Sequence, residues 1–398
     1  MEHQKEEHYL LILGILCISI CLRAPLTAVG PLIEDIGKDL VVSPSLLGMI
    51  TTLPVLVFGV TSPFINSFSR KLGYNFTVMI GLVFLVIGIL LRSFYGFWGL
   101  LFGTILMAFG IGVGNVLLPS IIKSRFGESG GMITGAYMTI QGVFAGIGAG
   151  LSLPLAIKLG FGWRITLSVW AIAAVIALLL WVPQVSEKEF QIKNQFLQSQ
   201  KKLKGNKKNV WASPWAWHIT LFLGSQSLLF YSLSNWIPSI LADRGLSVEA
   251  ISMAATWYQW SAVPTTFLAP ILIQKMKNKK ILAAMIGIGY FIGIVLFLIS
   301  GTSVVLLLIA LAIASASGGA NYSLSMTMIV LVSNDAQEAG ELSGMSQCAG
   351  YLLAALGPVV SGILYDYTGQ WTATLLFYLL VTFVLFISGQ LVMKHDSL

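Results

Sequence analysis

Charged residues are scarce in this chain of 398 residues: Asp, Glu, Lys and Arg make up 10%, whereas hydrophobic residues make up 56%. A soluble globular domain carries about 25% charged residues. The 16 acidic and 23 basic residues cannot cover the surface of a soluble protein of this length, which excludes an ordinary cytosolic enzyme. Cysteine is scarcer still, with three residues, which excludes a disulfide-rich scaffold. This composition is typical of a polytopic membrane protein.

The sequence also lacks the motifs of nucleotide-driven and catalytic proteins. It has no P-loop, no dinucleotide-binding glycine fingerprint and no Ser-His-acid set. The cysteines do not indicate a metal site, because no His or acidic residue accompanies Cys17, Cys21 or Cys348. We therefore predict a protein that is not an enzyme and that carries no cofactor or metal.

Long apolar runs take the place of these motifs. A helix needs about 20 mostly apolar residues to cross the hydrocarbon core of a bilayer, and runs of this length require internally bonded backbone. The sequence predicts twelve transmembrane helices, at 9–30, 46–67, 75–93, 97–122, 130–158, 164–182, 213–238, 248–272, 279–298, 303–332, 340–364 and 371–393. The first run is expected to be retained, because acidic residues precede it and Arg23 interrupts it, unlike a cleavable signal peptide.

The basic residues indicate the orientation. With both termini in the cytoplasm, 17 basic residues lie inside and five outside, the five being Lys38, Arg92, Lys158, Arg164 and Arg244. We predict a multi-pass inner-membrane protein with both termini cytoplasmic. The net charge of +7 then reflects topology and contact with anionic lipid rather than nucleic-acid binding.

The two halves of the chain resemble each other at offsets of about 206–209 residues. Gly131 and Gly135 match Gly340 and Gly344, and Asn115 matches Asn321. A polar, Lys-rich stretch separates the halves, which predicts an N-terminal six-helix bundle (1–182), a cytoplasmic linker with an amphipathic surface helix (183–212) and a C-terminal six-helix bundle (213–398). Two parallel repeats of this kind are the arrangement of major facilitator transporters, which bind substrate between the halves.

The sequence resembles the cyanate and 2-nitroimidazole transporter branch of the major facilitator superfamily. The residues that carry the resemblance are 22–31 (LRAPLTAVGP), 52–54 (TLP), 114–119 (GNVLLP), 230–231 (FY) and 236–238 (WIP). The loop between spans two and three is expected to act in gating, with Arg70 and Gly73 as its family residues. Ser69 stands where the superfamily has Asp, which puts the usual gating charge pair in doubt.

Arg23 is the most informative single residue. It lies about 14 residues into the first span, roughly 21 Å along the helix. An Arg at a helix centre costs about 2.5–3.5 kcal/mol to insert, so such residues usually face the protein interior. We expect Arg23 to bind an anionic or strongly dipolar substrate through its planar set of donors. The alternative is a structural Arg that bonds carbonyls near Pro25 or reaches the outer interface.

All sixteen acidic residues fall in predicted loops or at span ends, and none lies in the middle of a span. Exporters of cationic drugs resemble one another in keeping a buried carboxylate, so its absence favours a negatively charged or neutral polar cargo.

The resemblance implies that spans one, four, seven and ten line the central cavity. Polar residues in these spans are candidate substrate contacts or interhelical hydrogen bonds: Thr27, Asn115, Gln226, Tyr231, Asn235, Asn321 and Tyr322. Trp257 in span eight is a candidate for stacking on a planar substrate, although ordinary packing is the favoured interpretation. Gln141 and Gln347 rank lower, and Gly142, Gly146 and Gly150 are expected to allow close helix packing.

The sequence therefore predicts an all-α secondary transporter that moves a small anionic or planar polar solute by alternating access. A proton or counter-anion as coupled species stays open, and a monomer in lipid is the expected state. The alternative function is efflux of uncharged hydrophobic compounds across an aromatic wall. A membrane sensor is disfavoured, because the chain shows an internal repeat and lacks a soluble output domain.

Overall fold

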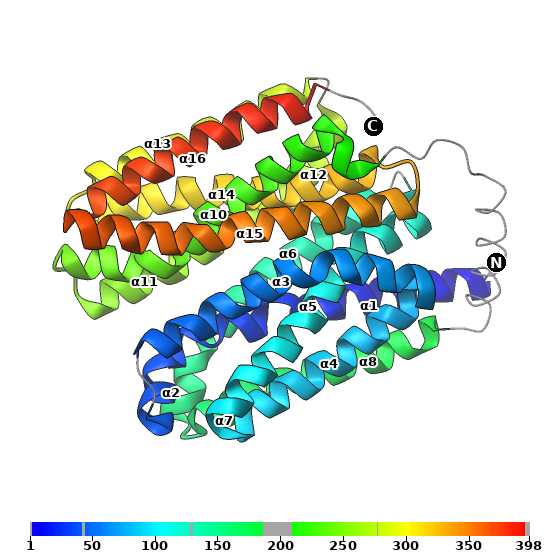
Figure 1. The fold of residues 1–398 in the computed structure, drawn as a ribbon, viewed down its shortest axis with the longest axis horizontal. Coiled ribbons are helices and arrows are strands. Elements are labelled where there is room, and N and C mark those ends of the chain that lie inside the picture. Colours follow the sequence, from blue (N-terminus) through cyan, green and yellow to red (C-terminus); the bar gives the residue numbers. More distant parts are fainter. Residues whose placement is uncertain (1, 42–43, 128–129, 186–208, 277, 395–398) are drawn as a thin grey trace.

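The computed structural model describes residues 2–41, 44–127, 130–185, 209–276 and 278–394. The regular elements in these ranges are all helices, and Figure 1 shows them as long rods in two groups. α1 (Glu2–Thr27) begins and α16 (Trp371–Val392) ends at one end of the molecule, here called the terminal end. α2 (Ile33–Leu40) and α7 (Gly162–Ser168) lie at the opposite end, here called the far end.

The first group, the N half, contains the helices up to residue 184. Besides α1, α2 and α7, they are η1 (Gly30–Leu32), α3 (Pro44–Leu72), α4 (Tyr74–Phe94), α5 (Gly96–Phe126), α6 (Gly130–Leu153), η3 (Pro154–Lys158), α8 (Trp170–Trp181) and η4 (Val182–Gln184). The second group, the C half, begins after the linker. Besides α16, its helices are η5 (Val210–Ala212), α10 (Pro214–Asp243), α11 (Val248–Trp260), α12 (Val263–Lys275), α13 (Lys279–Ile299), α14 (Val304–Val332) and α15 (Ala336–Thr368). Most of the predicted linker, including its amphipathic helix, lies outside the described residues.

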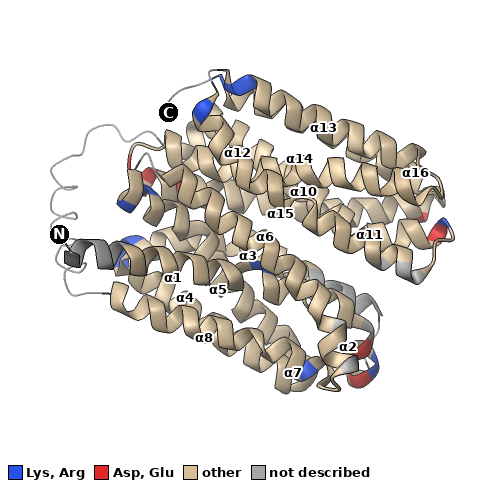
Figure 2. Ribbon diagram, turned by 180° about the vertical axis from the view of Figure 1, so that it is seen from behind, with Lys and Arg blue, Asp and Glu red and all other residues tan. Residues whose placement is uncertain are grey.

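Ten of the twelve predicted spans coincide with helical segments that are long and apolar enough to cross a membrane, counted over the described residues. The remaining two correspond to α10 and to the α11–α12 pair. α10 has sufficient length, but polar residues such as Gln226 and Asn235 interrupt its apolar run. α11 and α12 are 13 residues each, because the helix breaks at Ser261–Ala262 and restarts with Pro264 in its first turn. Figure 2 shows the charged segments gathered at the two ends, with little charge between them.

The two halves meet along α3 with α15, α6 with α12 and α5 with α15. Small residues permit this approach at the terminal end. A Cβ atom on Gly340 of α15 would lie 2.6 Å from Ser120 Oγ of α5 and 2.8 Å from Asn66 Oδ1 of α3. A Cβ atom on Gly135 of α6 would lie 3.1 Å from Pro270 of α12. Glycine therefore sets the distance between the halves at this end.

The predicted glycine ladder of α6 serves mainly this contact between halves. A Cβ atom on Gly142 would lie 3.3 Å from Val263, and one on Gly146 would clash with the indole of Trp260. Gly150, by contrast, faces open space. The ladder is thus a packing surface in its first two positions.

Arg92 departs from the sequence prediction, which counts it among the basic residues of the outer side. Its side chain is fully buried in α4, and none of its three guanidinium nitrogens has a hydrogen-bond partner among the described residues. The helix neighbours explain the burial. A Cβ atom on Gly103 of α5 would clash with the backbone of Arg92, so the two helices press closely together at this level. The N half therefore contains a second buried cation besides Arg23.

Candidate substrate site

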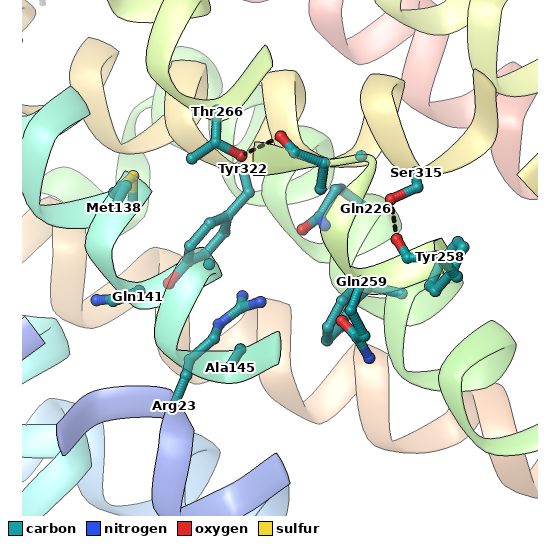
Figure 3. A pocket seen from close by; sticks show the side chains of 15 residues that line it. Arg23, Met138, Gln141, Ala145, Gln226, Tyr258, Gln259, Thr266, Ser315 and Tyr322 are labelled. Carbon is teal, nitrogen blue, oxygen red and sulfur yellow. Dashed lines mark hydrogen bonds between the residues drawn. The ribbon is translucent and has the colours of Figure 1, made fainter. Parts of the chain in front are cut away.

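A cavity between the two halves is built around Arg23 of α1 (Figure 3). The half-buried guanidinium lies 4.7 Å from the ring centre of Phe230 in α10 and 4.8 Å from that of Tyr322 in α14. Both rings belong to the C half, so cation–π contacts connect the halves through this one side chain. No carboxylate of the described residues forms an ion pair with Arg23. Its charge is therefore available to an anionic or dipolar solute.

One face of α6 forms the wall on the N-half side. Met138, Gln141, Gly142 and Ala145 line the cavity, at the spacing of a single helix face. Gln141 is 1% exposed, and neither its Nε2 nor its Oε1 atom has a hydrogen-bond partner among the described residues. A buried amide normally finds partners for both atoms. Gln141 thus lines the cavity with an enclosed amide whose donor and acceptor are both unused by these residues.

The C-half wall is made of polar side chains whose hydrogen bonds are largely internal. The Ser315 hydroxyl donates to the Tyr258 carbonyl, and the Thr266 hydroxyl donates to the Ala262 carbonyl at 2.8 Å. Gln259 Nε2 donates to Ser234 Oγ at 3.3 Å, and Ser227 Oγ donates to Gln226 Oε1 at 3.3 Å. These bonds hold the wall in shape, and each of its two glutamines has one amide atom engaged.

Aromatic rings connect the cavity to the interface of the halves. The ring centre of Phe58 in α3 lies 5.2 Å from that of Tyr351 in α15, and the ring centre of Tyr351 lies 6.4 Å from that of Tyr231 in α10. Phe230 continues the row at 5.3 Å from Tyr231 and 6.3 Å from Tyr258. Flat apolar surfaces of this kind can hold a planar solute against the Arg23 guanidinium.

The cavity itself is small, about 30 Å³, which is room for a water molecule or two. A solute of even one ring must displace side chains or separate the halves to enter. The structure therefore represents a contracted form of the site.

The model of the Major Facilitator Superfamily matches residues 15–250 and 227–396. The chain belongs to the major facilitator superfamily. This confirms the family resemblance and the fold class predicted from the sequence, two related six-helix bundles.

The relatives of this superfamily member are transporters. The chain is 38% identical to the uncharacterized transporter YycB of Bacillus subtilis (strain 168), over 98% of this chain and 94% of the relative. It is 32% identical to the 2-nitroimidazole transporter of Escherichia coli (strain K12), over 95% and 94%. It is also 25% identical to the cyanate transport protein CynX of the same organism, over 91% of each chain. The protein is thus a transporter and not an enzyme, as predicted.

Solved structures support the fold. The proton:xylose symporter XylE superimposes with a TM-score of 0.77 at 12% identity, covering 98% of this chain and 95% of XylE. FucP in its outward conformation gives a TM-score of 0.69 at 16% identity, with 96% and 99% coverage. At these identities the likeness concerns the fold alone.

Only some of the predicted site residues of this superfamily member lie at the cavity. Arg23, Gln226 and Tyr322 line the cavity, and Tyr231 lies in the adjoining aromatic row. Thr27 lies beside the cavity, where its hydroxyl donates to the Ala145 carbonyl at 2.7 Å and ties α1 to α6.

The other predicted contacts lie away from the cavity lining. Asn115 accepts a hydrogen bond at its backbone carbonyl from Gln347 Nε2 of α15, at 2.7 Å. Asn321 is fully buried and accepts from Ser325 Oγ at 3.2 Å, and Asn235 is exposed. Trp257 lines a separate groove of about 330 Å³ with Met253, Thr256 and Trp260.

The lining helices also differ from those implied by the resemblance. α5 contributes no residue to the cavity, because its Asn115 region packs against α15. α6, α11 and α12 contribute instead. Phe230, Tyr258 and Gln259 are lining residues outside the predicted set, and Gln141, a lower-ranked candidate of the sequence analysis, also lines the cavity. Spacing alone does not show which partner an amide has, so it could not rank Gln141 higher.

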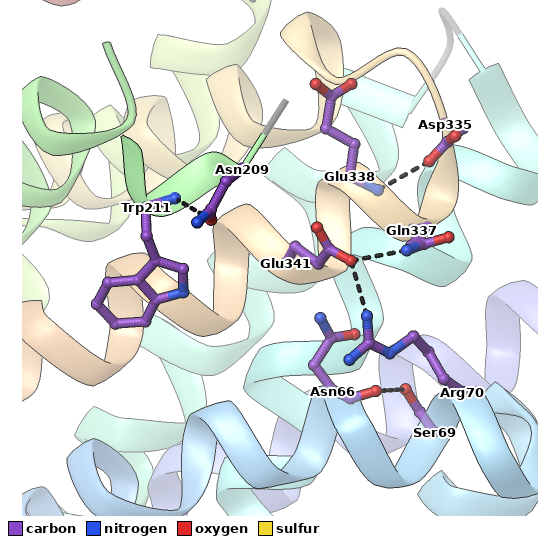
Figure 4. Close-up of polar contacts among 9 residues, drawn as sticks. All are labelled: Asn66, Ser69, Arg70, Asn209, Trp211, Asp335, Gln337, Glu338 and Glu341. Atoms are coloured by element: carbon purple, nitrogen blue, oxygen red, sulfur yellow. Dashed lines mark hydrogen bonds and ion pairs between the residues drawn. The ribbon is translucent and has the colours of Figure 1, made fainter. Parts of the chain in front are cut away.

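The predicted gating loop supplies one partner of an ion pair between the halves (Figure 4). Arg70 Nη1 of α3 lies 2.9 Å from Glu341 Oε1 of α15, and Gln337 donates to the same oxygen. Ser69, which replaces the expected Asp, donates to the Asn66 carbonyl at 2.9 Å. Gly73 has φ of 96°, a value that favours glycine, and joins α3 to α4. The acid that partners Arg70 thus comes from the opposite half.

Proposed function

We propose that this transporter moves a small anionic or planar polar solute, of the cyanate or nitroimidazole type, between the two faces of the membrane. The observation that carries the proposal is Arg23, a cation between the halves with two aromatic contacts and no acidic partner among the described residues. Guanidinium donors match the paired planar oxygens of a nitro group or carboxylate, and ring faces suit a planar solute. The substrate named for one relative, 2-nitroimidazole, has both features, and cyanate, named for another, is a small anion that a guanidinium attracts.

In this proposal the residues 1–182 and 213–398 rock against each other around Arg23, joined by the linker 183–212, with both termini in the cytoplasm. The contracted cavity and the contact of the halves at the terminal end support such a cycle. A monomer suffices, because both walls come from one chain.

The test is transport by purified protein in liposomes, with radiolabelled cyanate and 2-nitroimidazole, with and without a pH gradient. Arg23→Ala removes a charge-assisted interaction and is expected to reduce uptake of the preferred solute about 10- to 100-fold. Arg125→Ala, an exposed cation at the end of α5, is the matched control and should transport normally. A folded Arg23→Ala protein with unchanged uptake would contradict the proposal.

Efflux of uncharged hydrophobic compounds is the second candidate. The groove of Met253, Thr256, Trp257 and Trp260 supports it, since three of its side chains are large, apolar and exposed. A hydrophobic dye in the same liposome panel separates the two functions. Dye transport that survives Arg23→Ala and fails in Trp257→Ala would favour the second candidate.

A further inference from the structure

Gln141 differs from the other amides of the described residues that have fully enclosed, unpartnered atoms. Gln347, Asn66 and Asn321 each have one unpartnered side-chain atom, whereas both amide atoms of Gln141 lack a partner. Leaving a buried polar group unpaired is unfavourable. The other lining residues on its helix face, Met138 and Ala145, are apolar, so a leucine would fill the same place without that penalty.

The placement of Gln141 suggests a purpose for this unpaired amide. It lines the same cavity as Arg23, and in Figure 3 Arg23 lies between Gln141 and Gln259. Gln259 Nε2 donates to Ser234, and Gln226 Oε1 accepts from Ser227, so each of these lining amides has one atom engaged. Gln141 is therefore the lining amide with neither atom bonded to the described residues.

The two residues offer different chemistry to a solute. A guanidinium has only donors, so Arg23 is satisfied by oxygen acceptors. The Gln141 amide has a donor and an acceptor, and its Oε1 atom requires an N–H or O–H group. A solute with acceptors alone, such as cyanate, leaves Oε1 unpaired. A planar ring that carries a nitro group and a ring N–H satisfies both residues.

We infer that Gln141 is a specificity-determining residue that selects solutes with an N–H donor beside a planar oxygen pair. The inference rests on the proposed function, because it assumes that Arg23 holds the oxygens. A site built to bond a substrate N–H rejects an analogue that lacks it, since the buried acceptor is then left unpaired. N-methylation of the ring removes the donor while it keeps the nitro group and the plane.

The experiment measures competition for binding to the purified full chain by 2-nitroimidazole, 1-methyl-2-nitroimidazole and cyanate. The wild type is expected to bind the N–H compound roughly 10- to 100-fold more tightly than the N-methyl compound. In Gln141→Leu this ratio should fall to about 1–3, and the N-methyl compound should bind no worse than to wild type. Leucine has a similar size, so a purely steric effect of the methyl group would survive the substitution.

Gln259→Leu is the matched control, because it removes from the same cavity an amide whose Nε2 atom already donates to Ser234, and its ratio should match the wild type. A fall in the Gln259→Leu ratio as large as in Gln141→Leu would overturn the assignment to Gln141. An unchanged ratio in Gln141→Leu, or a wild type that does not distinguish the two compounds, would overturn the inference. The comparison of the two compounds on the wild type needs no variant, so it still tests the inference if Gln141→Leu fails to fold. Arg23-dependent binding without N–H selectivity overturns this inference alone, whereas no binding of any of the three solutes overturns the proposed function with it.

Discussion

Arg70 of α3 and Glu341 of α15 form an ion pair of 2.9 Å that connects the N half to the C half at the terminal end. The pair lies beside the glycine contact of Gly340 with Asn66 and Ser120, where the helices of both halves are closest. The terminal end is therefore held closed by packing and by one charge pair. Opening this end requires that the pair separates.

Breaking the pair should shift the protein towards states with the terminal end open. The side chains are partly exposed, and exposed pairs contribute about 0.2–1 kcal/mol, so Glu341→Gln should change the open-to-closed ratio by at most about fivefold. Spin labels at Ser124 and Lys275, exposed on opposite halves, would report longer distances. The exchange Arg70→Glu with Glu341→Arg should restore the wild-type distribution. A distance distribution in Glu341→Gln that equals the wild type would show that packing alone closes this end.

At the far end, each half contains a hydrogen bond from a tryptophan indole to an aspartate carboxylate. Trp371 Nε1 donates to Asp243 Oδ2 at 2.8 Å in the C half, and Trp163 Nε1 donates to Asp39 Oδ2 at 3.2 Å in the N half. Each tryptophan begins the last span of its half, and each aspartate follows the first. The repeat of the sequence is thus a repeat of tertiary contacts.

The hydrogen bonds that Asp243 accepts in the C half predict that part of the protein's stability is lost in acid. The Tyr365 hydroxyl and the Trp371 indole both donate to Asp243, which lowers the pKa of this exposed carboxyl below its ordinary value. A carboxyl with a lowered folded-state pKa stabilises the fold above its unfolded pKa of about 3.9 and loses that contribution as pH falls through the folded-state pKa. The melting temperature of Asp243→Asn should therefore be lower than wild type at pH 6, and the gap should narrow as the pH falls below the unfolded pKa of about 3.9. Parallel melting curves from pH 6 to pH 3 would contradict this role.

Arg92 should be dispensable for folding. Its guanidinium is fully buried without a partner among the described residues, and apolar replacements of buried charges are often neutral or stabilising by about 1–4 kcal/mol. Arg92→Met is expected to keep or raise the melting temperature in detergent. Arg244→Met is the contrasting variant, because Arg244 donates to Ser300 Oγ at 2.8 Å and to the Phe297 carbonyl at 3.0 Å. A large loss of stability in Arg92→Met alone would reveal a role that the contacts do not explain.

Gly88 should tolerate no side chain. A Cβ atom there would lie 2.7 Å from the Gly103 carbonyl oxygen and would clash with the backbone of Met107, so α4 and α5 would have to separate. Overpacking of this kind costs about 1–3 kcal/mol, and Gly88→Ala should lower the melting temperature accordingly. Gly150→Ala is the matched helical control, because nothing lies within 4 Å of its Cβ position. Equal melting temperatures of the two variants would argue against backbone contact as the reason for Gly88.

Hydropathy located the helices well, because each span must satisfy its own backbone hydrogen bonds whatever its neighbours are. It could not foresee the break between α11 and α12 at Ser261–Ala262, which divides one predicted span. Nor could it foresee that Arg92 turns inward, since a basic residue at a span end is compatible with either the surface or the core.

The candidate site, too, could be predicted from the sequence only in part. The scarcity of charge, the repeat and the isolated Arg23 are properties of the chain itself, and they determined the family, the fold class and the cation of the cavity. The partners of polar side chains depend on helix rotation and on contacts over more than a hundred residues. Only the tertiary structure decided that Asn115 faces α15, that Thr27 bonds α6 and that Glu341 pairs with Arg70. It also decided that Gln141 lines the cavity with an amide unpaired among the described residues.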